Sequence, residues 1–587
     1  MEITRLFDLL DNYIEKYPKQ DAAVACKRNG VWRKFSIQEY VELTNAISYS
    51  MMYLGVKPGD KIGIVSGNRP EWNMIDFAAM QIGAVSTPIY PTISQDDYRH
   101  ILNHAEMKMI FIEGKELHKK LNPILPEIKS LKEIITFAPQ DEGYKYFDQL
   151  VELGRQNPQP EKLAEIKQSI KETDVASIIY TSGTTGVPKG VMLSHSNMIK
   201  NFINVAEIPA KWNNKALSFL PICHAYERML VYLYHYLGMS IYYVESLATI
   251  SQNIKEVNPT MMSCVPRLLE KIYYKLYAAG KSLSFTKRTI YYWAFKLATK
   301  YQLDNNNLWY NLRLKIADKL IYSQWRKAIG GNFDIVVSGG SAIQSQIAAF
   351  FSAIGMPVFE GYGLSETSPV IAVSRRGKNQ RRFGTVGLPL PGVEVKISDE
   401  NEILCRGHNV MQGYYKDPEL TAKVIDSEGW FHTGDTGKFT PENLLIITGR
   451  LKSIFKTSFG KYVNPEVIES KFSESHFIEN IIVVGENKKF AAALIVPDFQ
   501  YLKSWCETNN ITYTTNSEMI NNADVNKKIR EEVANYNRFF GDYEHIKRYQ
   551  LIADEWTVAN GILSPTLKVK RKIIAERYAG VIEKLFD

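Results

Sequence analysis

Strand-length apolar segments alternate with helical segments through most of the chain, and this alternation restricts the fold more than any other feature. The apolar segments include Lys61–Ser66, Met109–Glu113, Glu133–Phe137, Ala176–Tyr180, Asp334–Ser338 and Pro357–Glu360. Such alternation is typical of α/β proteins whose sheets are largely parallel. Because 587 residues exceed the usual size of one folding unit, we predict an α/β chain with more than one domain.

Two changes of composition along the chain predict the domain organisation. Gly384–Gly392 (GTVGLPLPG) consists of turn residues, and short β segments follow it as far as Ile447, so we expect a small β-barrel-like part there. A second break lies at Gly449–Lys452, and a smaller α/β tail follows it. We therefore predict a large N-terminal domain over residues 1–449, built of parallel-sheet subdomains, and a C-terminal domain over residues 450–587, with a hinge near 450–452.

The composition narrows the class of protein and its compartment. The 71 Lys and Arg against 63 Asp and Glu leave a surplus of +8, which suits nucleic acid, membrane phosphate or an anionic cofactor. The five cysteines are widely spaced with no C-x-x-C pair, which favours a reducing cytoplasm over a disulfide or zinc framework. The N-terminus lacks the features of a signal peptide. Met229–Val244 is too short to span a bilayer and is interpreted as a buried helix followed by a buried strand.

The segment Tyr180–Gly190 (YTSGTTGVPKG) has the composition of an anion-binding loop. Gly183 and Gly186 allow backbone N–H groups to approach an anion closely, and Lys189 adds positive charge. Hydroxyl donors to phosphate oxygens are supplied by Thr181, Ser182, Thr184 and Thr185. The spacing does not fit a Walker A loop. The alternative, a flexible surface turn, is disfavoured because eleven residues rarely form such a pattern by chance.

Glu360–Thr367 (EGYGLSET) carries side chains suited to a nucleotide. Tyr362 lies between Gly361 and Gly363, so its ring can stack on adenine while the backbone approaches closely. Glu366 offers the hard oxygen ligands that Mg²⁺ prefers, and Thr367 can hydrogen-bond an α-phosphate. A helix-capping turn is the alternative for Ser365–Thr367.

Asp435 and Arg450 are candidate contacts to a ribose. An ionised carboxylate only accepts hydrogen bonds, so Asp435 can take both hydroxyl donors of a ribose diol. Arg450 can add a second contact to ribose or phosphate. The alternatives are a turn or cap aspartate and a surface salt bridge.

The loop Tyr180–Gly190 resembles the phosphate loop of the acyl-adenylate-forming superfamily, which includes acyl-CoA synthetases, non-ribosomal peptide adenylation domains and firefly luciferase. Other segments are similar to motifs of this family in the same order, over residues 177–572: Leu220–Arg228 (acyl pocket), Ser338–Ala342 and Glu360–Thr367 (adenine), Trp430–Asp435 (ribose), Gly449–Lys452 (hinge), Phe455–Tyr462 (coenzyme A loop) and Pro565–Lys568 (catalytic lysine).

The resemblance implies a role for each matching residue. Binding of ATP falls to Thr181, Ser182, Gly183, Thr184, Thr185, Gly186, Lys189, Gly339, Gly340, Glu360, Gly361, Tyr362, Gly363, Thr367, Asp435 and Arg450, and binding of coenzyme A to Gly460 and Lys461. The same comparison makes Glu366 and Thr184 the Mg²⁺ ligands, Lys452 the hinge, and Lys568, Glu366, Thr184 and His224 the catalytic residues. Lys570 competes with Lys568, and only the register within Pro565–Lys568 favours Lys568. For His224 a packed core histidine is the alternative to an acyl-pocket gate.

The resemblance also implies a two-step reaction. A carboxylate attacks the α-phosphate of Mg·ATP to give acyl-adenylate and pyrophosphate, and the thiol of coenzyme A then displaces AMP. No side-chain nucleophile is required, so positioning and charge neutralisation carry the chemistry. In resembling enzymes the small C-terminal domain is mobile and rotates between the steps.

The acid substrate is expected to be a long-chain fatty acid. Amino-acid-activating relatives place an Asp in the acyl-pocket segment, whereas Pro221–Leu230 holds only Glu227, next to Arg228. The form of Phe455–Val463 and the aromatic helical segment 264–330 look most like the long-chain branch. A medium-chain, aryl or other carboxylate–CoA ligase, a fatty-acyl adenylate ligase and a catalytically silent lipid- or adenylate-binding protein stay open as alternatives.

Three features bear on partners. In the helical segment after Cys264, apolar residues such as Leu269 and Tyr273 share one face and Lys271 and Lys275 the other, which indicates a helix packed on the core or a docking element for membrane or partner. The basic loop Arg375–Arg382 is interpreted as solvated, with contact to membrane phosphate or coenzyme A as the alternative. We expect a cytoplasmic protein, with peripheral contact to the inner membrane surface and a homodimer both left open, and no nucleic-acid partner.

Overall fold

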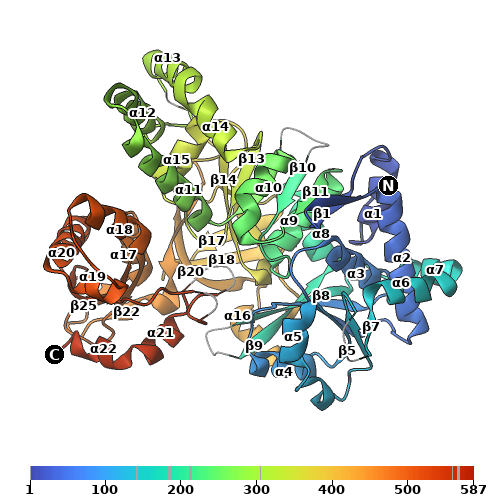
Figure 1. Ribbon diagram of the computed structural model, residues 1–587. Helices are drawn as coiled ribbons and strands as arrows, with labels where there is room; N and C mark the ends of the chain where they lie inside the picture. The colour runs from blue at the N-terminus through green and yellow to red at the C-terminus, as the bar shows by residue number, and fades with distance from the viewer. Residues whose placement is uncertain are drawn as a thin grey trace.

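The structure is a computed structural model that describes residues 2–139, 143–182, 187–209, 215–304, 306–557, 560–564 and 569–587. Two large sheets with their helices form the body of the molecule, shown from blue to yellow in Figure 1. A group of helices projects from this body, and a smaller α/β unit, orange to red, lies beside it. The α/β fold predicted from the alternating segments is confirmed, and each of the six strand-length segments overlaps a strand.

The first sheet of the body has the strand order β16-β15-β14-β13-β12-β10-β11-β1-β2. Pairing is parallel from β14 through to β1 and antiparallel at both edges. Its strands are β1 (Val24–Arg28), β2 (Val31–Phe35), β10 (Lys215–Ser218), β11 (Ser240–Tyr243), β12 (Met261–Cys264), β13 (Ile335–Ser338), β14 (Val358–Gly363), β15 (Val370–Val373) and β16 (Leu388–Pro389).

The second sheet of the body has the order β19-β9-β8-β4-β3-β5-β6-β7. Pairing is parallel from β8 to β7, while β9 joins β8 as an antiparallel hairpin. Its strands are β3 (Lys61–Val65), β4 (Val85–Ile89), β5 (Met107–Ile112), β6 (Glu133–Thr136), β7 (Lys145–Tyr146), β8 (Val175–Ser182), β9 (Pro188–Ser194) and β19 (Gly413–Tyr414).

Helices of the body pack on these sheets and form three hydrophobic clusters with them. They are α1 (Asp8–Lys16), α2 (Ile37–Tyr53), α3 (Pro70–Gln81), α4 (Gln95–His104), α5 (Gly114–Leu121), α6 (Phe147–Gln156), α7 (Pro160–Ser169), α8 (His195–Ile203), α9 (Ala225–Tyr236), α10 (Ile250–Val257), α15 (Ser345–Ala353) and α16 (Pro418–Val424). Every residue of α3 is buried, including the polar residues Glu71, Asn73, Asp76 and Gln81. The apolar stretch Met229–Val244 forms most of α9 and the whole of β11, as predicted, and both are buried.

A small antiparallel sheet follows the turn-rich segment Gly384–Gly392. Its order is β17-β18-β20-β21, from β17 (Val393–Ile397), β18 (Glu402–Gly407), β20 (Phe431–Phe439) and β21 (Leu445–Arg450). β20 pairs with β21 so that Asp435 lies opposite Arg450. Pairing of these two strands therefore brings the two predicted ribose contacts together.

The residues after Arg450 form a unit with a hydrophobic core of its own, whose members run from Phe455 to Leu585. It contains the hairpin β22 (Phe455–Lys456) and β23 (Tyr462–Val463) and a sheet of β24 (Ile478–Val484), β25 (Ala491–Pro497) and β26 (Ile546–Leu551). Its helices are α17 (Pro465–Phe472), α18 (Phe499–Thr508), α19 (Asn516–Asn521), α20 (Ala523–Asn537), α21 (Arg571–Arg577) and α22 (Ala579–Lys584). The exact domain boundary, and the mobility of this unit, stay predictions.

The projecting helices, residues 266–329, are called the helical arm. They are α11 (Pro266–Ala279), α12 (Phe285–Ala298), α13 (Leu308–Ala317), the π-helical turn Asp318–Tyr322 and α14 (Ser323–Ile329). Leu269 and Tyr273 are buried and Lys271 and Lys275 exposed, so the predicted packing of this helix face on the core is confirmed. The described helices include none that is both long and apolar enough to cross a membrane.

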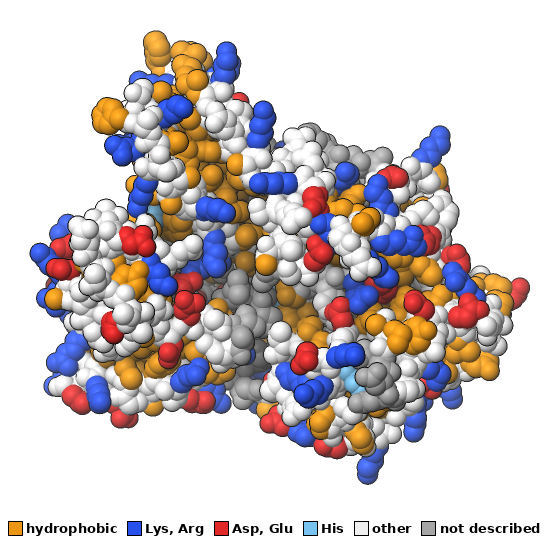
Figure 2. Space-filling model, viewed as in Figure 1, with side chains coloured by type: hydrophobic (Ala, Val, Ile, Leu, Met, Phe, Trp, Pro, Cys, Tyr) orange, Lys and Arg blue, Asp and Glu red, His pale blue; other side chains and the backbone are white. Residues whose placement is uncertain are grey.

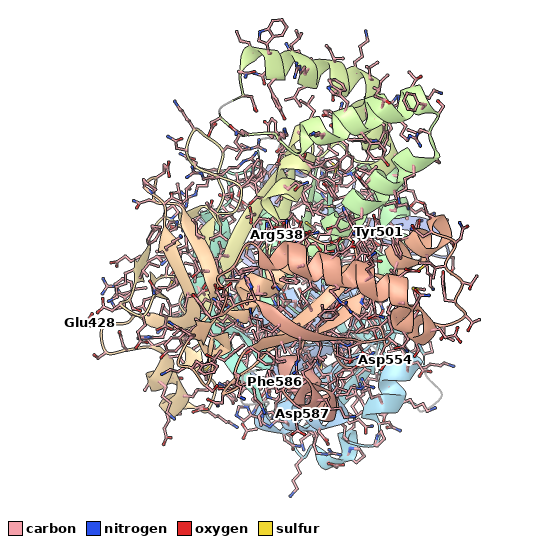
Figure 3. The ribbon with its side chains drawn as sticks, turned by 90° about the vertical axis from the view of Figure 1, so that its left-hand side faces the viewer. Glu428, Tyr501, Arg538, Asp554, Phe586 and Asp587 are labelled. Atoms are coloured by element: carbon pink, nitrogen blue, oxygen red, sulfur yellow. The ribbon has the colours of Figure 1, made fainter. Side chains whose placement is uncertain are left out.

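The helical arm touches the C-terminal unit through its base. Arg267 of α11 donates to Glu479 at 2.7 Å, and the His476 ring stacks on Tyr277 at 5.5 Å between centroids. Lys281 lies over the ring of Tyr501, which Figure 3 shows on the C-terminal unit just below the arm. These contacts are polar and aromatic rather than a continuous apolar core.

Candidate functional site

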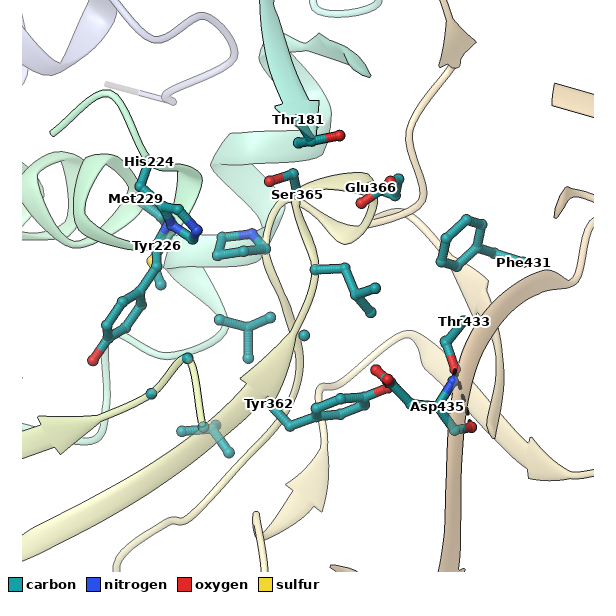
Figure 4. A pocket seen from close by; sticks show the side chains of 18 of the residues that line it. Thr181, His224, Tyr226, Met229, Tyr362, Ser365, Glu366, Phe431, Thr433 and Asp435 are labelled. Carbon is teal, nitrogen blue, oxygen red and sulfur yellow. Dashed lines mark hydrogen bonds between the residues drawn. The ribbon is translucent and has the colours of Figure 1, made fainter. Parts of the chain in front are cut away.

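One cavity of about 590 Å³ collects most of those predicted site residues that the structure describes. Strands β13 and β14 lead into it, as do the hairpin β8–β9, the helix α9 and the strand β20. Figure 4 shows its two sides: Thr433 and Asp435 on one, His224 and Met229 on the other, with Thr181, Ser365 and Glu366 between them. Its volume falls in the usual range for small-molecule sites.

The polar side of the cavity is built on Asp435. The Tyr362 hydroxyl donates to Asp435 Oδ2 at 2.8 Å, and Arg450 Nε lies 3.0 Å from Asp435 Oδ1. Burial, reinforced by the neighbouring Asp435, holds the pKa of Tyr362 well above its usual value, so the phenol stays a proton donor. Arg450 is half exposed, whereas Asp435 is buried. Tyr362 and Arg450 thus orient the Asp435 carboxylate, an acceptor of hydrogen bonds, at the wall of the cavity.

The structure requires glycine at two positions of this wall. One is Gly363, beside Tyr362, and the other is Gly340, after β13. A Cβ on Gly363 would lie 1.7 Å from the Pro369 carbonyl oxygen, so no other residue fits there. Gly340 has φ +83°, a left-handed conformation that favours glycine. Both residues line the cavity, together with Gly339 and Gly361. The backbone can therefore approach a flat ligand closely at this wall.

Glu366 lies in a 3-10 turn, Ser365–Thr367, that reaches into the cavity. Its Oε1 accepts a hydrogen bond from the Tyr414 hydroxyl at 2.8 Å. Burial and this carboxylate together raise the pKa of Tyr414, which fixes the phenol as the donor. Lys189 lies over the ring of Tyr414, 5.4 Å from its centre. A carboxylate oriented in this way, at a wall shared with a lysine, fits a hard divalent cation bound together with phosphate.

The hairpin β8–β9 carries the start and the end of the predicted phosphate loop. Thr181 pairs with Lys189 across the hairpin, and both residues line the cavity. The backbone of Ser182 ends β8 opposite Pro188. Gly183, Thr184, Thr185 and Gly186 lie outside the described residues. Ser194 caps the following helix α8 by accepting from the Asn197 N–H at 3.1 Å, which anchors the end of the hairpin.

The other side of the cavity is apolar. Its walls come from the turn after α8, from α9 and from strands β12 to β14, and they include Val205, Ile208, Met229, Leu230, Leu233, Met261, Ile335, Val337 and Phe359. His224 caps α9 by accepting from the Tyr226 N–H at 3.2 Å, and it lies on this side of the cavity near Met229. The predicted acyl-pocket segment and the predicted nucleotide segments therefore meet in one cavity.

Family models match almost the whole chain. The model described as AMP-binding enzyme matches residues 10–415, and the model described as AMP-binding enzyme C-terminal domain matches residues 453–587. The chain belongs to the AMP-binding enzyme family.

Relatives of the AMP-binding family cover nearly the full chain. Long-chain-fatty-acid–CoA ligase FadD15 of Mycobacterium bovis is 32% identical, over 95% of this chain and 93% of its own length. Long chain acyl-CoA synthetase 7, peroxisomal, of Arabidopsis thaliana is 30% identical, over 100% of this chain and 87% of its own. Long-chain-fatty-acid–CoA ligase 1 of Homo sapiens is 28% identical, over 100% and 87%.

Solved structures share the fold at lower identity. The adenylation domain of a carboxylate reductase from Mycobacterium chelonae has a TM-score of 0.78 and 19% identity, covering 99% of this chain and 91% of that one. The anthranilate CoA ligase AuaEII, solved with anthranoyl-AMP, has a TM-score of 0.73 and 17% identity, covering 99% and 98%. At these identities the likeness shows the adenylate-forming fold of the AMP-binding family alone.

Some predicted residues that the structure describes do not line the cavity in this member of the AMP-binding family. Among the described residues, the cavity lining does not include Glu360, Thr367, Gly460 or Lys461. Glu360 is buried, and burial raises its pKa to about 8 despite the nearby Arg381. The Thr367 hydroxyl donates to the Pro369 carbonyl at 2.7 Å and so holds its own turn. Their predicted ligand contacts stay predictions.

The predicted coenzyme A and catalytic segments lie after the hinge. Gly460 and Lys461 form the exposed turn between β22 and β23, which closes through Thr457 N–H donating to the Lys461 carbonyl at 2.9 Å. The backbone of Lys452 lies in the 3-10 turn Leu451–Ser453. Lys568 lies outside the described residues. Lys570, its competitor, is exposed at the start of α21.

Two cavity residues were missed in the sequence. Tyr414 orients Glu366, and the Tyr226 hydroxyl donates to the Val337 carbonyl at 2.9 Å beside Gly339. Tyr226 stands in the segment Leu220–Arg228, whose resemblance gave a signal for it. Tyr414 follows a glycine in a two-residue strand, and no local pattern indicates that it meets Glu366, 48 positions away.

Proposed function

We propose that this protein is an AMP-forming long-chain fatty-acid–CoA ligase. The observation that carries the proposal is one cavity that joins a polar side, with Asp435, Glu366 and Lys189, to an apolar side walled by α9 and β12–β14. ATP requires the first side and a fatty chain the second, and adenylation requires both ligands to meet. Full-length relatives named as long-chain ligases support the same reaction.

The polar side would hold ATP. Asp435 would accept the ribose hydroxyls, Tyr362 and the glycine wall would flank the adenine, and Thr181 and Lys189 would contact phosphate. Glu366, oriented by Tyr414, would hold Mg²⁺ bound with ATP, and this ion would neutralise phosphate charge during the attack of the carboxylate. Thr184 and Thr185 are also predicted to contact ATP or Mg²⁺, and this prediction rests on the sequence alone.

The apolar side would hold the acyl chain. Each buried methylene contributes about 0.8 kcal/mol, or roughly a fourfold gain in kcat/KM until the apolar walls end. The two charged residues of the acyl-pocket segment face elsewhere: Glu227 accepts from Ser218 at 2.6 Å, and Arg228 pairs with Asp76 at 2.5 Å. This arrangement supports a fatty acid rather than an amino acid, because neither residue is available to bind a substrate amine.

The second step would require the C-terminal unit to turn. Lys568 would face the cavity for adenylation, and the turn with Gly460 and Lys461 would face it for transfer to coenzyme A. The contacts of Arg267 with Glu479 and of Tyr277 with His476 would break in that movement. Surface ion pairs and single ring contacts contribute little each, so such an interface suits an exchange of positions.

The test is a panel of carboxylates of rising chain length with Mg·ATP, with and without coenzyme A, with AMP and thioester measured separately. We expect both products, with kcat/KM rising along the saturated series to a long-chain optimum. No AMP with any acid would contradict the enzyme. An adenylate that never reaches coenzyme A would favour an adenylate ligase, and an optimum at short or aryl acids would overturn the long-chain assignment.

A variant of the apolar wall sharpens this test. Ile208→Trp fills space at the apolar wall of the cavity, so we expect the optimum to move to a shorter acid while short acids react as before. Ile208→Leu, which keeps the volume, is the matched control and should leave the optimum in place. An unchanged optimum in Ile208→Trp would show that the chain does not lie along this wall.

The role of Lys568 is tested by separating the half-reactions. Lys568→Ala should slow adenylation by roughly 10²–10³-fold, while thioester formation from supplied acyl-adenylate stays near its normal rate. Lys570→Ala is the matched control and should leave both half-reactions intact. An equal fall of both half-reactions in Lys568→Ala would contradict the two-position account.

A further inference from the structure

Large apolar side chains are exposed together at the end of the helical arm, on α12, α13 and the π-helical turn. The set, called the apolar tip, comprises Phe285, Ile290, Trp293, Leu308, Trp309, Leu312, Ile316 and Leu320. Leu308 is 87% exposed, Phe285 77% and Trp309 74%, so most of the surface of these side chains is open to solvent. Figure 2 shows hydrophobic side chains gathered at this end of the molecule. A soluble protein seldom leaves such a group open without a partner.

The exposed faces are the outer faces of well-packed helices, not frayed ends. On α12 the opposite face is buried through Tyr291, Ala294 and Phe295. Tyrosine hydroxyls hold the helices together: Tyr310 of α13 donates to the Leu297 carbonyl at 2.6 Å, and Tyr322 donates to the Ala294 carbonyl at 2.8 Å. Because residues four apart share a helix face, Leu308, Leu312 and Ile316 form one stripe along α13. The arm therefore presents its apolar tip in a fixed arrangement.

Basic residues surround the apolar tip. Residues 281–327 contain ten Lys and Arg against two Asp, which equals the +8 surplus of the whole chain; the rest of the chain is balanced. Of the two acids, Asp318 is paired with Arg326 at 2.5 Å. Within the part of the chain that the structure describes, no acid lies within ion-pair distance of the exposed Lys287, Lys296, Arg313, Lys315 or Lys319.

We propose that the apolar tip docks on a bilayer surface that contains anionic phospholipids. Phe, Trp and Leu would enter the boundary between headgroups and acyl chains, and the surrounding lysines and arginines would contact lipid phosphates, the division that amphipathic membrane-surface helices show. The charge selects this occupant: a surface with unpaired bases and hardly any acid repels a second copy of itself and attracts an anionic layer. The basic loop Arg375–Arg382 is less suited, because Arg375, Arg376 and Arg382 bond to the protein itself.

Docking on a bilayer is a property separate from the proposed ligase activity, and vesicle binding can be measured without any turnover of substrate. The experiment uses sedimentation of the full chain with vesicles of phosphatidylcholine alone or mixed with phosphatidylglycerol. We expect binding to the mixed vesicles that weakens at high salt, and little binding to phosphatidylcholine alone. Leu308→Ser/Trp309→Ser should weaken binding by about tenfold or more, since two large apolar side chains no longer enter the bilayer.

Matched variants separate the apolar tip from general surface effects. Val31→Ser/Phe539→Ser removes two apolar side chains exposed elsewhere, 71% and 64%, and should bind vesicles like the parent protein. Lys315→Glu/Lys319→Glu should lose more than about tenfold in binding, at about fivefold for each basic residue near the surface. Lys129→Glu/Lys162→Glu makes the same change of charge outside the helical arm, and this variant should lose much less vesicle binding.

Three outcomes would overturn the proposal. Equal binding by the tip variants and the parent would place the contact elsewhere. Equal binding to neutral and anionic vesicles would remove the role of charge. A dimer in solution that Leu308→Ser/Trp309→Ser converts to a monomer, with vesicle binding unchanged, would make the tip an interface between copies. Circular dichroism and AMP formation from a soluble acid should be unchanged in every variant, so that a folding defect is recognised and the ligase proposal is judged separately.

Discussion

Two Asp–Arg pairs of this protein have similar distances and opposite surroundings. Asp76 and Arg228 join α3 to α9 at 2.5 Å in the core, and both side chains are at most 1% exposed. Asp435 and Arg450 join β20 to β21 at 3.0 Å at the edge of the cavity, where the arginine is 52% exposed. The first pair also binds Tyr232 and Ser177, so its hydrogen-bonding capacity is used within the protein. The second pair lines the cavity, where its carboxylate can meet a ligand.

The difference teaches what each pair can do. A buried pair with all its partners inside the protein fixes the packing of two helices, and removing one member leaves an uncompensated charge in the core. A pair at a cavity edge contributes little to stability, but its carboxylate is oriented before a ligand arrives. Stability should therefore depend on the first pair, and binding of ATP on the second.

The largest effect is expected at Arg228. Arg228→Met leaves the Asp76 carboxylate buried without its partner, and we expect a loss of about 3–5 kcal/mol in the free energy of unfolding, measured by denaturant titration. The double variant Arg228→Met/Asp76→Leu should recover much of this loss. Arg155→Met, which breaks the exposed pair with Glu42 at 2.8 Å, is the control and should cost less than about 1 kcal/mol. Equal losses of unfolding free energy in Arg228→Met and Arg155→Met would show that burial of the Asp76–Arg228 pair does not matter for stability.

A smaller effect, on binding, is expected at Asp435. Asp435→Asn keeps the shape but removes the charge that would accept two ribose hydroxyls, so kcat/KM for ATP should fall by about 10–100-fold, mostly through KM. The melting temperature should hardly change, because the side chain lies at a cavity edge. Ser398→Ala, in the turn after β17, is a control that leaves ATP binding unchanged. A large loss of stability with normal KM would reverse the roles of the two pairs.

The sequence predicted these two sites unequally. Asp435 and Arg450 stand in family-like motifs and face each other through the pairing of neighbouring strands, so their meeting could be anticipated. Asp76 and Arg228 are 152 positions apart, and the local pattern marks each only as a charge in an apolar helix. The apolar segments predicted the sheets because a strand that is buried on both faces consists of continuous apolar residues, which can be recognised in the sequence. Contacts such as Tyr414 with Glu366 depend on how distant elements pack, which no short pattern encodes.

Glu227, the neighbour of Arg228, tests whether every buried charge needs a counter-charge. It accepts from Ser218 at 2.6 Å and from Ser263, and burial raises its pKa to about 7. Its folded pKa lies above the unfolded value, so its stabilising contribution is complete below about pH 4.5 and is lost as the pH rises through 7. Glu227→Gln should therefore gain stability over the parent at pH 8 relative to pH 5, on the order of 2 kcal/mol.

The measurement for Glu227 is the difference in unfolding free energy between parent and variant across this pH range. Glu161→Gln, on the exposed side of α7, is the matched control and should show no pH-dependent difference. A constant difference for Glu227→Gln would show that this carboxyl does not change charge between pH 5 and pH 8 in the folded protein.

The smallest effect on stability is expected at Arg450. Arg450→Gln removes the half-exposed member of the cavity pair, and Asp435 still accepts from Tyr362, so the free energy of unfolding should change by less than about 1 kcal/mol. The KM for ATP should rise several-fold, less than in Asp435→Asn, and Arg450→Lys should restore part of it, because a charge near the carboxylate returns without the planar geometry of the guanidinium. Denaturant titration and initial rates on the same preparations measure both quantities. A loss of stability comparable to that of Arg228→Met would mean that the cavity pair holds the fold as the core pair does, and the contrast between the two would be wrong.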